Sequence, residues 1–267
     1  GLIRQKPFSD WKDSIEREGI TFLTNLLYWK VLKNIKKTNI LFYEKNENSS
    51  EKNEDESDSE LCWDNISVNP DIIRNRIIKI FFRNKVFYSV FNNGVLQPYY
   101  GLDENLLAIE WKFVQNLEAR GLFKGIIEKA NKRTFFGPPV EPEYPYFKKG
   151  TFKLTKPSHV YLAGVQGYHD KYYWSWVLAL LAKISLDLGF TIDGRNLSVK
   201  IREIVFRDQT VYDAYQHYSF DNGKTYNETL QQVKTRGFRA EHDWLWGATY
   251  ILDLIDYQFC DYEIVNY

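Results

Sequence analysis

The chain has 267 residues, 44% of them hydrophobic and 26% charged, which is the composition of an ordinary globular protein with a full core. The chain has 35 lysines and arginines and 35 aspartates and glutamates, so its formal net charge is zero. This net charge gives no reason to expect a nucleic acid or an anionic membrane as partner. No apolar run approaches the roughly 18 residues of a membrane span, and two cysteines are too few for a disulfide-stapled secreted scaffold, so we expect a soluble, intracellular protein.

The first 43 residues predict a helical segment, either a hairpin of two helices or one kinked helix. Ser9 is placed to cap a first helix over residues 10–18. After Gly19, apolar residues recur at helical spacing as far as Ile35, which predicts a second helix. The sequence NILFYEK at 39–45 then reads as a short strand.

An acidic segment follows at residues 44–60, with eight acidic and two basic side chains and no apolar residue. Such a segment cannot bury enough surface to offset the entropy lost on ordering. We therefore predict a disordered loop.

Residues 61–137 predict a subdomain of hairpin strands followed by helices. Strands are expected at 77–82, 85–91 and 95–100, and Asn93 with Gly94 forms a strong hairpin-turn signal between the last two. A helix is expected over 106–117, and Gly121 is expected to break or kink it before a second helical stretch at 122–132.

Four prolines between positions 138 and 145 predict an extended linker over 138–147. The main body, 148–267, opens with expected strands at 151–155 and 159–165. A helix is predicted from 170 to 188, with Asp170 as its cap and Gly189 just past its end.

Alternating apolar residues at 196–206 predict a strand with a bulge at Arg202 and Glu203. Helices are expected around 209–218, 225–235 and 243–254, and a last strand near 257–265. Because strands and helices do not alternate regularly, the sequence favours one compact α+β domain with insertions, in which a mixed, largely antiparallel sheet packs with several helices.

Two histidine–aspartate pairs, His169–Asp170 and His242–Asp243, are the candidate catalytic residues. Imidazole and carboxylate groups serve in acid–base catalysis and as metal ligands. Neither pair has the spacing of a helical metal site, and common nucleophile, phosphate-loop and zinc motifs are absent. For the first pair, a helix cap at Asp170 and a surface position for His169 are the simpler explanation. We expect no metal and no cofactor.

The sequence YHDKYYWSW at 168–176 concentrates aromatic side chains in a protein that is already 17% aromatic. Tyr172, Tyr173, Trp174 and Trp176 could stack against a sugar or a base, or form the start of a buried helix.

A basic segment at residues 120–156 holds nine lysines and arginines against three glutamates. Its candidate contact residues are interleaved with phenylalanine and tyrosine; they are Lys132, Arg133, Lys148, Lys149 and Lys153. This pattern suits single-stranded nucleic acid or an acidic protein surface, although lysines are also common on any surface.

These features favour a non-catalytic interaction or assembly subunit that contacts a protein partner through an aromatic-rich surface and a basic face. One alternative is a hydrolase of phosphoesters or glycosides whose site combines both histidine–aspartate pairs. Another is a single-stranded nucleic-acid-binding protein. The sequence leaves open whether Cys62 and Cys260 pair, and why it contains no methionine.

Overall fold

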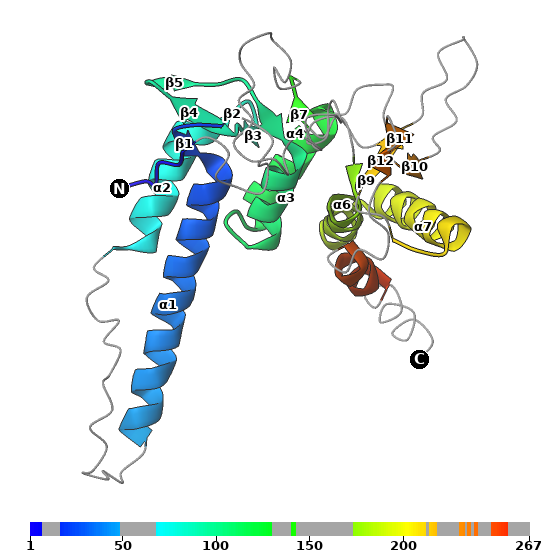
Figure 1. Cartoon of the computed structure of the whole chain (residues 1–267). Helices are drawn as coiled ribbons and strands as arrows, with labels where there is room; N and C mark the ends of the chain where they lie inside the picture. The colour runs from blue at the N-terminus through cyan, green and yellow to red at the C-terminus, as the bar shows by residue number, and fades with distance from the viewer. Residues whose placement is uncertain are drawn as a thin grey trace.

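The computed structural model of the chain describes residues 1–6, 17–48, 68–129, 140–142, 173–211, 214–217, 230–232, 234–235, 238–239 and 247–255. These residues form an α+β fold of helices and short antiparallel strand pairs, which confirms the predicted fold class (Figure 1). The helices are α1 Phe22–Asn48, α2 Pro70–Phe81, α3 Leu102–Glu110, α4 Asn116–Lys129, α6 Ser175–Asp187 and α7 Thr191–Asp208. Residues 247–255 are also helical.

The strands are short and pair antiparallel throughout the described part of the chain. They are β1 Ile20–Thr21, β2 Phe82–Arg83, β3 Val86–Phe87, β4 Val90–Asn92, β5 Val95–Leu96, β6 Tyr100–Gly101, β7 Val140–Glu141, β8 Tyr173–Trp174, β9 Ala214–His217, β10 Leu230–Gln232, β11 Lys234–Thr235 and β12 Phe238–Arg239. Two sheets have three strands, in the orders β1-β4-β5 and β10-β9-β8, and the other strands form pairs.

Helix α1 is a single long helix that begins at Phe22, so the helix predicted after Gly19 is confirmed. The strand predicted at 39–45 is wrong, because these residues continue α1 as far as Asn48. The helix predicted over 10–18 lies almost wholly outside the described residues.

Helix α2 occupies residues predicted to form a strand at 77–82. The Asn69 side chain accepts a hydrogen bond from the Asp71 amide, and Pro70 starts the helix, so the N-terminus carries its own signals. The buried residues Pro70, Ile73, Ile77 and Phe81 follow helical spacing. Residues 77–81 of the apolar run are therefore the C-terminal part of an amphipathic helix, and Phe82 begins β2.

Two hairpins follow α2. The predicted turn at Asn93 and Gly94 is confirmed, since both have positive φ (49° and 78°) between the paired strands β4 and β5. A second two-residue turn, at Asn84 and Lys85, joins β2 to β3 with φ of 50° and 68°.

Helices α3 and α4 are separated by residues 111–115, and Gly121 lies inside α4. The expected break at Gly121 is therefore wrong: α3 ends before Phe113, and α4 runs through the glycine. Phe113 is 1% exposed in the connecting loop, where it closes the core between α1 and α3.

Helix α6 confirms the predicted apolar helix and its end at Gly189, where φ is +79°. Its start is different. The helix begins at Ser175, after the strand residues Tyr173 and Trp174, so the predicted start at 170 is wrong; Asp170 itself lies outside the described residues.

Helix α7 replaces the strand and bulge predicted at 196–206. Its buried residues include Leu197, Ile201 and Ile204, which are separated by four and three positions and face α6. The apparent phase slip at Arg202 and Glu203 is thus the period of a helix.

The helices predicted at 209–218 and 225–235 are also wrong where the structure describes them. β9 forms the centre of a sheet with β8 and β10, and β11 pairs with β12. The helix at 247–255 agrees with the prediction at 243–254.

The core is continuous from α1 to the helix at 247–255. Its N-terminal part is an aromatic cluster in which the Phe22 and Phe87 rings stack at 4.5 Å and Trp29 meets Phe113 edge-on at 4.9 Å. Phe123 of α4 contacts Phe190, before α7, at 5.0 Å and so joins the two halves. Among the described residues, no helix is both long and apolar enough to cross a bilayer.

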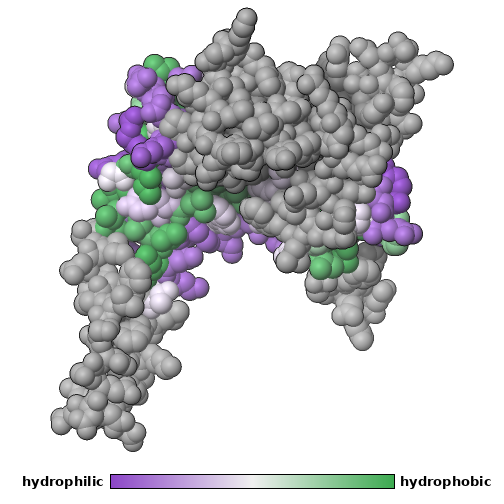
Figure 2. Space-filling view, in the orientation of Figure 1, coloured by the Kyte–Doolittle hydropathy of each residue, from purple (hydrophilic) through white to green (hydrophobic). Residues whose placement is uncertain are grey.

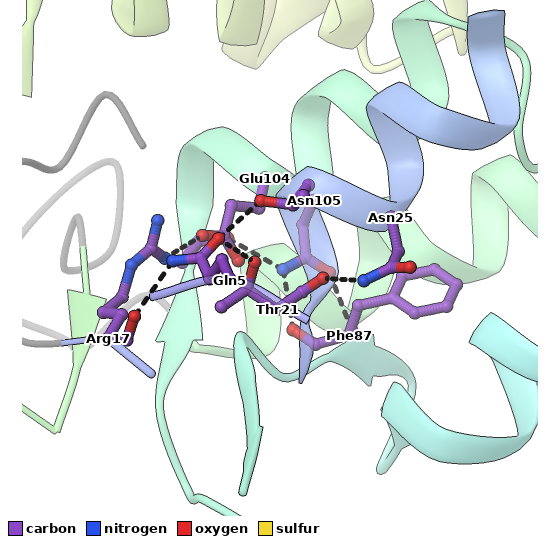
Figure 3. Close-up of polar contacts among 9 residues, drawn as sticks. Gln5, Arg17, Thr21, Asn25, Phe87, Glu104 and Asn105 are labelled. Carbon is purple, nitrogen blue, oxygen red and sulfur yellow. Dashed lines mark hydrogen bonds and ion pairs between the residues drawn. The ribbon is translucent and has the colours of Figure 1, made fainter. Parts of the chain in front are cut away.

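A polar cluster fastens the N-terminal segment to α1 and α3 (Figure 3). The hydroxyls of Thr21 and Thr24 both donate to the Gln5 side-chain oxygen, at 2.6 and 2.5 Å. Arg17 and Glu104 form an ion pair whose side chains are 1% and 0% exposed. A charge pair this deeply buried fixes the segment before β1 against the start of α3.

The loop predicted at 44–60 is wrong for residues 44–48, which are helical in α1, and its remainder lies outside the described residues. The strands predicted at 151–155, 159–165 and 257–265 also lie outside them. Of the predicted linker, only residues 140–142 are described, and there Val140 and Glu141 pair as β7 with β6.

Candidate binding groove

The two histidine–aspartate pairs, His169–Asp170 and His242–Asp243, lie outside the described residues, as does Tyr172. The same is true of the basic contact residues Lys132, Arg133, Lys148, Lys149 and Lys153. Their predicted roles stay predictions. Within the described ranges, histidine, cysteine, aspartate and glutamate side chains form no cluster suited to a metal ion.

Three of the predicted stacking residues are packed in the core. Tyr173, Trp174 and Trp176 are 2%, 6% and 2% exposed. Tyr173 and Trp174 form β8, and the Trp176 ring contacts Tyr250 at 5.9 Å. These three rings are therefore buried at the start of helix α6 and do not form an open stacking surface.

A groove of about 410 Å³ lies between the end of α2, the β2–β3 hairpin, the α3–α4 connection and α4. We call it the α2–α4 groove. Its lining is mainly apolar and comprises Ile78, Phe82, Lys85, Phe87, Val114, Glu118, Gly121, Leu122 and Lys124. The volume is within the range of sites that hold small ligands or the anchoring side chains of a peptide.

The lining rests on the aromatic core. Phe87 and Leu122 are each 1% exposed, and the Phe87 ring stacks on Phe22 of α1. Phe82 is the exposed apolar residue of the lining, at 36%, and its ring lies 4.9 Å from that of Phe87. Because the deeper residues are held by close packing, the groove is preformed.

The hairpin wall is held close to α4 by a glycine. A Cβ added at Gly125 would lie 2.5 Å from the Lys85 carbonyl oxygen and 2.8 Å from the Lys85 Cβ. The absence of a side chain at Gly125 is therefore what lets α4 approach the β2–β3 turn. At the surface, Lys85 Nζ lies 2.6 Å from the Glu128 carboxylate and adds an ion pair across the same contact.

The opposite wall is tied by Arg74 of α2. Its Nε donates to the Phe113 carbonyl at 2.8 Å, and its Nη2 meets the Glu118 carboxylate of α4 at 2.7 Å. The guanidinium also lies over the Phe113 ring, 5.5 Å from its centroid. Arg74 thus ties α2 both to the α3–α4 connection, at Phe113, and to α4, at Glu118.

Gly121 leaves space open in the groove. A Cβ at Gly121 would meet no atom within 4 Å, in contrast to Gly125 one turn later. Leu117, Gly121 and Lys124 lie along one face of α4, and Leu117 is 85% exposed. An apolar surface therefore continues beyond the groove for about one helical turn, or roughly 6 Å.

The groove has a net positive rim. Lys85 is paired with Glu128, and Glu118 is paired with Arg74. Lys124 is exposed and forms no ion pair with any described residue, so it adds one positive charge beside the apolar lining. In Figure 2, exposed hydrophobic residues also gather over α1 and α2; they include Leu27, Val31 and Ile72.

The groove has no local sequence motif, because its lining comes from separate elements between residues 78 and 124. One feature of the sequence could have pointed to the groove. Gly121 and Gly125 are four residues apart in a helical stretch, a spacing that puts two residues without side chains on one helix face.

A comparison with known protein families finds no match for this chain, and a comparison with curated proteins finds none either.

Proposed function

We propose that this protein is a non-catalytic interaction subunit and that the α2–α4 groove is its binding site. The observation that carries the proposal is a preformed apolar groove whose only unpaired charge among the described lining residues is Lys124. The occupant that fits is an amphipathic protein segment with an acidic residue beside its apolar side chains.

The shape of the surface favours a peptide segment over a compact small molecule. Leu117 extends the apolar surface along α4 beyond the groove, and Phe82 borders it on the hairpin side. An amphipathic helix uses such an elongated surface through side chains spaced three or four residues apart.

Electrostatics adds a preference for the sign of the partner's charge. A carboxylate placed near Lys124 gains attraction without breaking an existing ion pair on the protein. Replacing that carboxylate by a basic residue would put like charges together at the rim, so a basic amphipathic segment should be rejected.

The proposal is tested by selecting binders from a random library of helical peptides on the wild-type protein, with Gly121→Leu used for counter-selection. Gly121→Leu fills the groove without meeting any atom at its Cβ position. We expect the recovered peptides to share apolar residues at helical spacing and an adjacent aspartate or glutamate.

Binding of the recovered peptides is then measured with Lys124→Glu, which reverses the rim charge. We expect the affinity to fall by about tenfold, or roughly 1.4 kcal/mol. Recovery of no peptide that distinguishes the wild type from Gly121→Leu would contradict the proposal. Binding of small aromatic carboxylates in the same groove without any peptide would instead assign it to a small ligand.

A further inference from the structure

Helix α7 carries an exposed apolar stripe that its packing inside the molecule does not use. Ile192, Val199 and Phe206 are 75%, 40% and 76% exposed. They are seven residues apart, so they lie nearly in line along the helix over about 21 Å. The opposite face, with Leu197, Ile201 and Ile204, is buried against α6.

The outer position of this helix leaves the stripe accessible. α7 packs beside α6 on the side away from α3, at the right of the molecule in Figure 1. In Figure 2, hydrophobic and hydrophilic residues appear side by side at this right edge. A solvent-exposed apolar line of this length on a helix is typical of a surface that binds another helix.

The charges beside the stripe decide which helix fits. At 100° per residue, Arg195 and Arg202 fall on one flank of the stripe, and Asn196 and Glu203 fall on the other. All four are exposed. Farther round the helix, burial lowers the pKa of Lys200, and the negative charge of Glu203 offsets part of that effect.

Two copies of this face complement each other in one direction only. In a parallel two-fold pair, the flanks with opposite charge meet, so Arg202 of each copy lies beside Glu203 of the other, and Val199 lies beside its own counterpart. In an antiparallel pair, the two arginine flanks would meet, and Arg195 would face Arg202.

We infer that α7 is a self-association surface on which a second copy of this chain docks in parallel, about a two-fold axis that runs along the helix. Ile192, Val199 and Phe206 supply the apolar contact, and the Arg202–Glu203 pair, formed twice by symmetry, fixes the direction. The surface is separate from the α2–α4 groove and does not depend on the function proposed for that groove. Because one helix provides the contact, we expect a weak, concentration-dependent dimer.

The mass of the protein in solution tests the inference, measured by sedimentation velocity over a concentration range of about two orders of magnitude. The wild type should shift from monomer towards dimer, and Phe206→Lys should raise the dissociation constant at least about tenfold. Val95→Lys is the matched control, because Val95 is also an exposed apolar residue, at 58%, but lies on β5. Circular dichroism verifies that each variant remains folded.

Charge reversal makes the test specific for the proposed pairing. Arg202→Glu and Glu203→Arg should each weaken the dimer, and the double variant should restore it, because the pair is then re-formed with exchanged signs. A wild type that stays monomeric at every concentration overturns the inference. A double variant as weak as the single ones does so as well.

Cross-linking tests the direction. In a protein with Cys62→Ser and Cys260→Ser, Ile192→Cys should form a disulfide-linked dimer on oxidation, since residue 192 meets its own counterpart in the parallel pair. In an antiparallel pair the two residues would lie about 21 Å apart, so dimers that fail to cross-link at this position contradict the inference.

Discussion

Two glycines in one helix, Gly121 and Gly125, have opposite structural roles. The Gly125 Cα faces the Lys85 backbone, and an added Cβ would meet the Lys85 carbonyl oxygen at 2.5 Å. Gly121 has open space at the same position. An alanine at Gly121 changes only the helix propensity of α4, whereas an alanine at Gly125 also clashes with the Lys85 backbone. Comparing the two variants therefore separates these two effects on stability.

We predict that Gly121→Ala stabilises the protein by about 0.5–1 kcal/mol, because alanine is the better helix former. Gly125→Ala gains the same propensity but forces α4 away from the β2–β3 turn, which costs about 1–3 kcal/mol. The free energy of unfolding in urea measures both. Equal stabilisation by the two substitutions would show that α4 does not lie against Lys85 as described.

The buried ion pair between Arg17 and Glu104 supports a second prediction at the scale of single residues. Glu104→Gln keeps the shape of the side chain but removes the negative charge that pairs with the Arg17 guanidinium in the core. We expect a loss of about 3–5 kcal/mol in the free energy of unfolding.

The double variant Arg17→Met/Glu104→Leu is the control for this pair, because it removes both charges and keeps the volume. It should cost less than Glu104→Gln alone, since both charges of the Arg17–Glu104 pair are removed together. If Glu104→Gln changes stability by less than about 1 kcal/mol, the pair is not buried in solution.

At the scale of elements, Lys183 of α6 links α3 and the helix at 247–255. Its ammonium lies 2.7 Å from the Asp253 carboxylate and 3.3 Å from the Glu110 carboxylate, and its side chain is 19% exposed. Burial alone would lower the pKa of Lys183, but the hydrogen bond to Asp253 and the two negative charges outweigh burial and raise it.

A raised lysine pKa stabilises the folded state at every pH below the unfolded pKa of about 10.4, and this contribution disappears as the pH rises through the folded pKa. We predict that the stability difference between the unsubstituted chain and Lys183→Met, about 1 kcal/mol or less, is constant from about pH 7 to pH 9.5 and shrinks above about pH 10.5. Urea unfolding at a series of pH values measures it.

The phenol of Tyr250 also titrates in the alkaline range, because burial raises its pKa, and its titration would add to that of Lys183. Both proteins should therefore carry Tyr250→Phe. A stability difference that already falls between about pH 6 and pH 9 would contradict a raised pKa for Lys183.

The elements also show what the sequence can predict. The turn at Asn93 and Gly94 and the apolar helix that became α6 were predicted correctly, because each has a strong local signal. The runs at 77–82 and 196–206 were predicted as strands, but residues 77–81 end α2 and residues 196–206 lie inside α7. A short run rich in isoleucine and valine suits either structure, and here packing decides, since helical spacing puts Ile73, Ile77 and Ile201 in the core.

At the scale of the whole molecule, aromatic side chains of the described residues build both halves of the core. Phe22, Trp29, Phe87 and Phe113 pack together in the N-terminal half, and Tyr173, Trp174 and Trp176 are buried in the C-terminal half. Composition could not distinguish a dense core from an exposed binding surface, because both use the same side chains. The groove was not predictable either, because it exists only when α2, the hairpin and α4 are brought together.

The molecule thus offers two surfaces that are not used by its own packing: the α2–α4 groove and the exposed stripe on α7. They lie on opposite sides of the contact between Phe123 and Phe190 that joins the two halves. A chain with one surface for a partner segment and another for its own copy would bind two partner segments per dimer.

The most direct test of the central claim is the affinity of a selected amphipathic acidic peptide, measured by titration calorimetry, for the wild type, Gly121→Ala and Gly121→Leu. We predict that alanine, which adds one methyl group in open space, changes the affinity less than threefold. We predict that leucine, which fills the groove, lowers the affinity at least about tenfold. Equal affinity for Gly121→Leu and the wild type would contradict the assignment of the α2–α4 groove as the binding site.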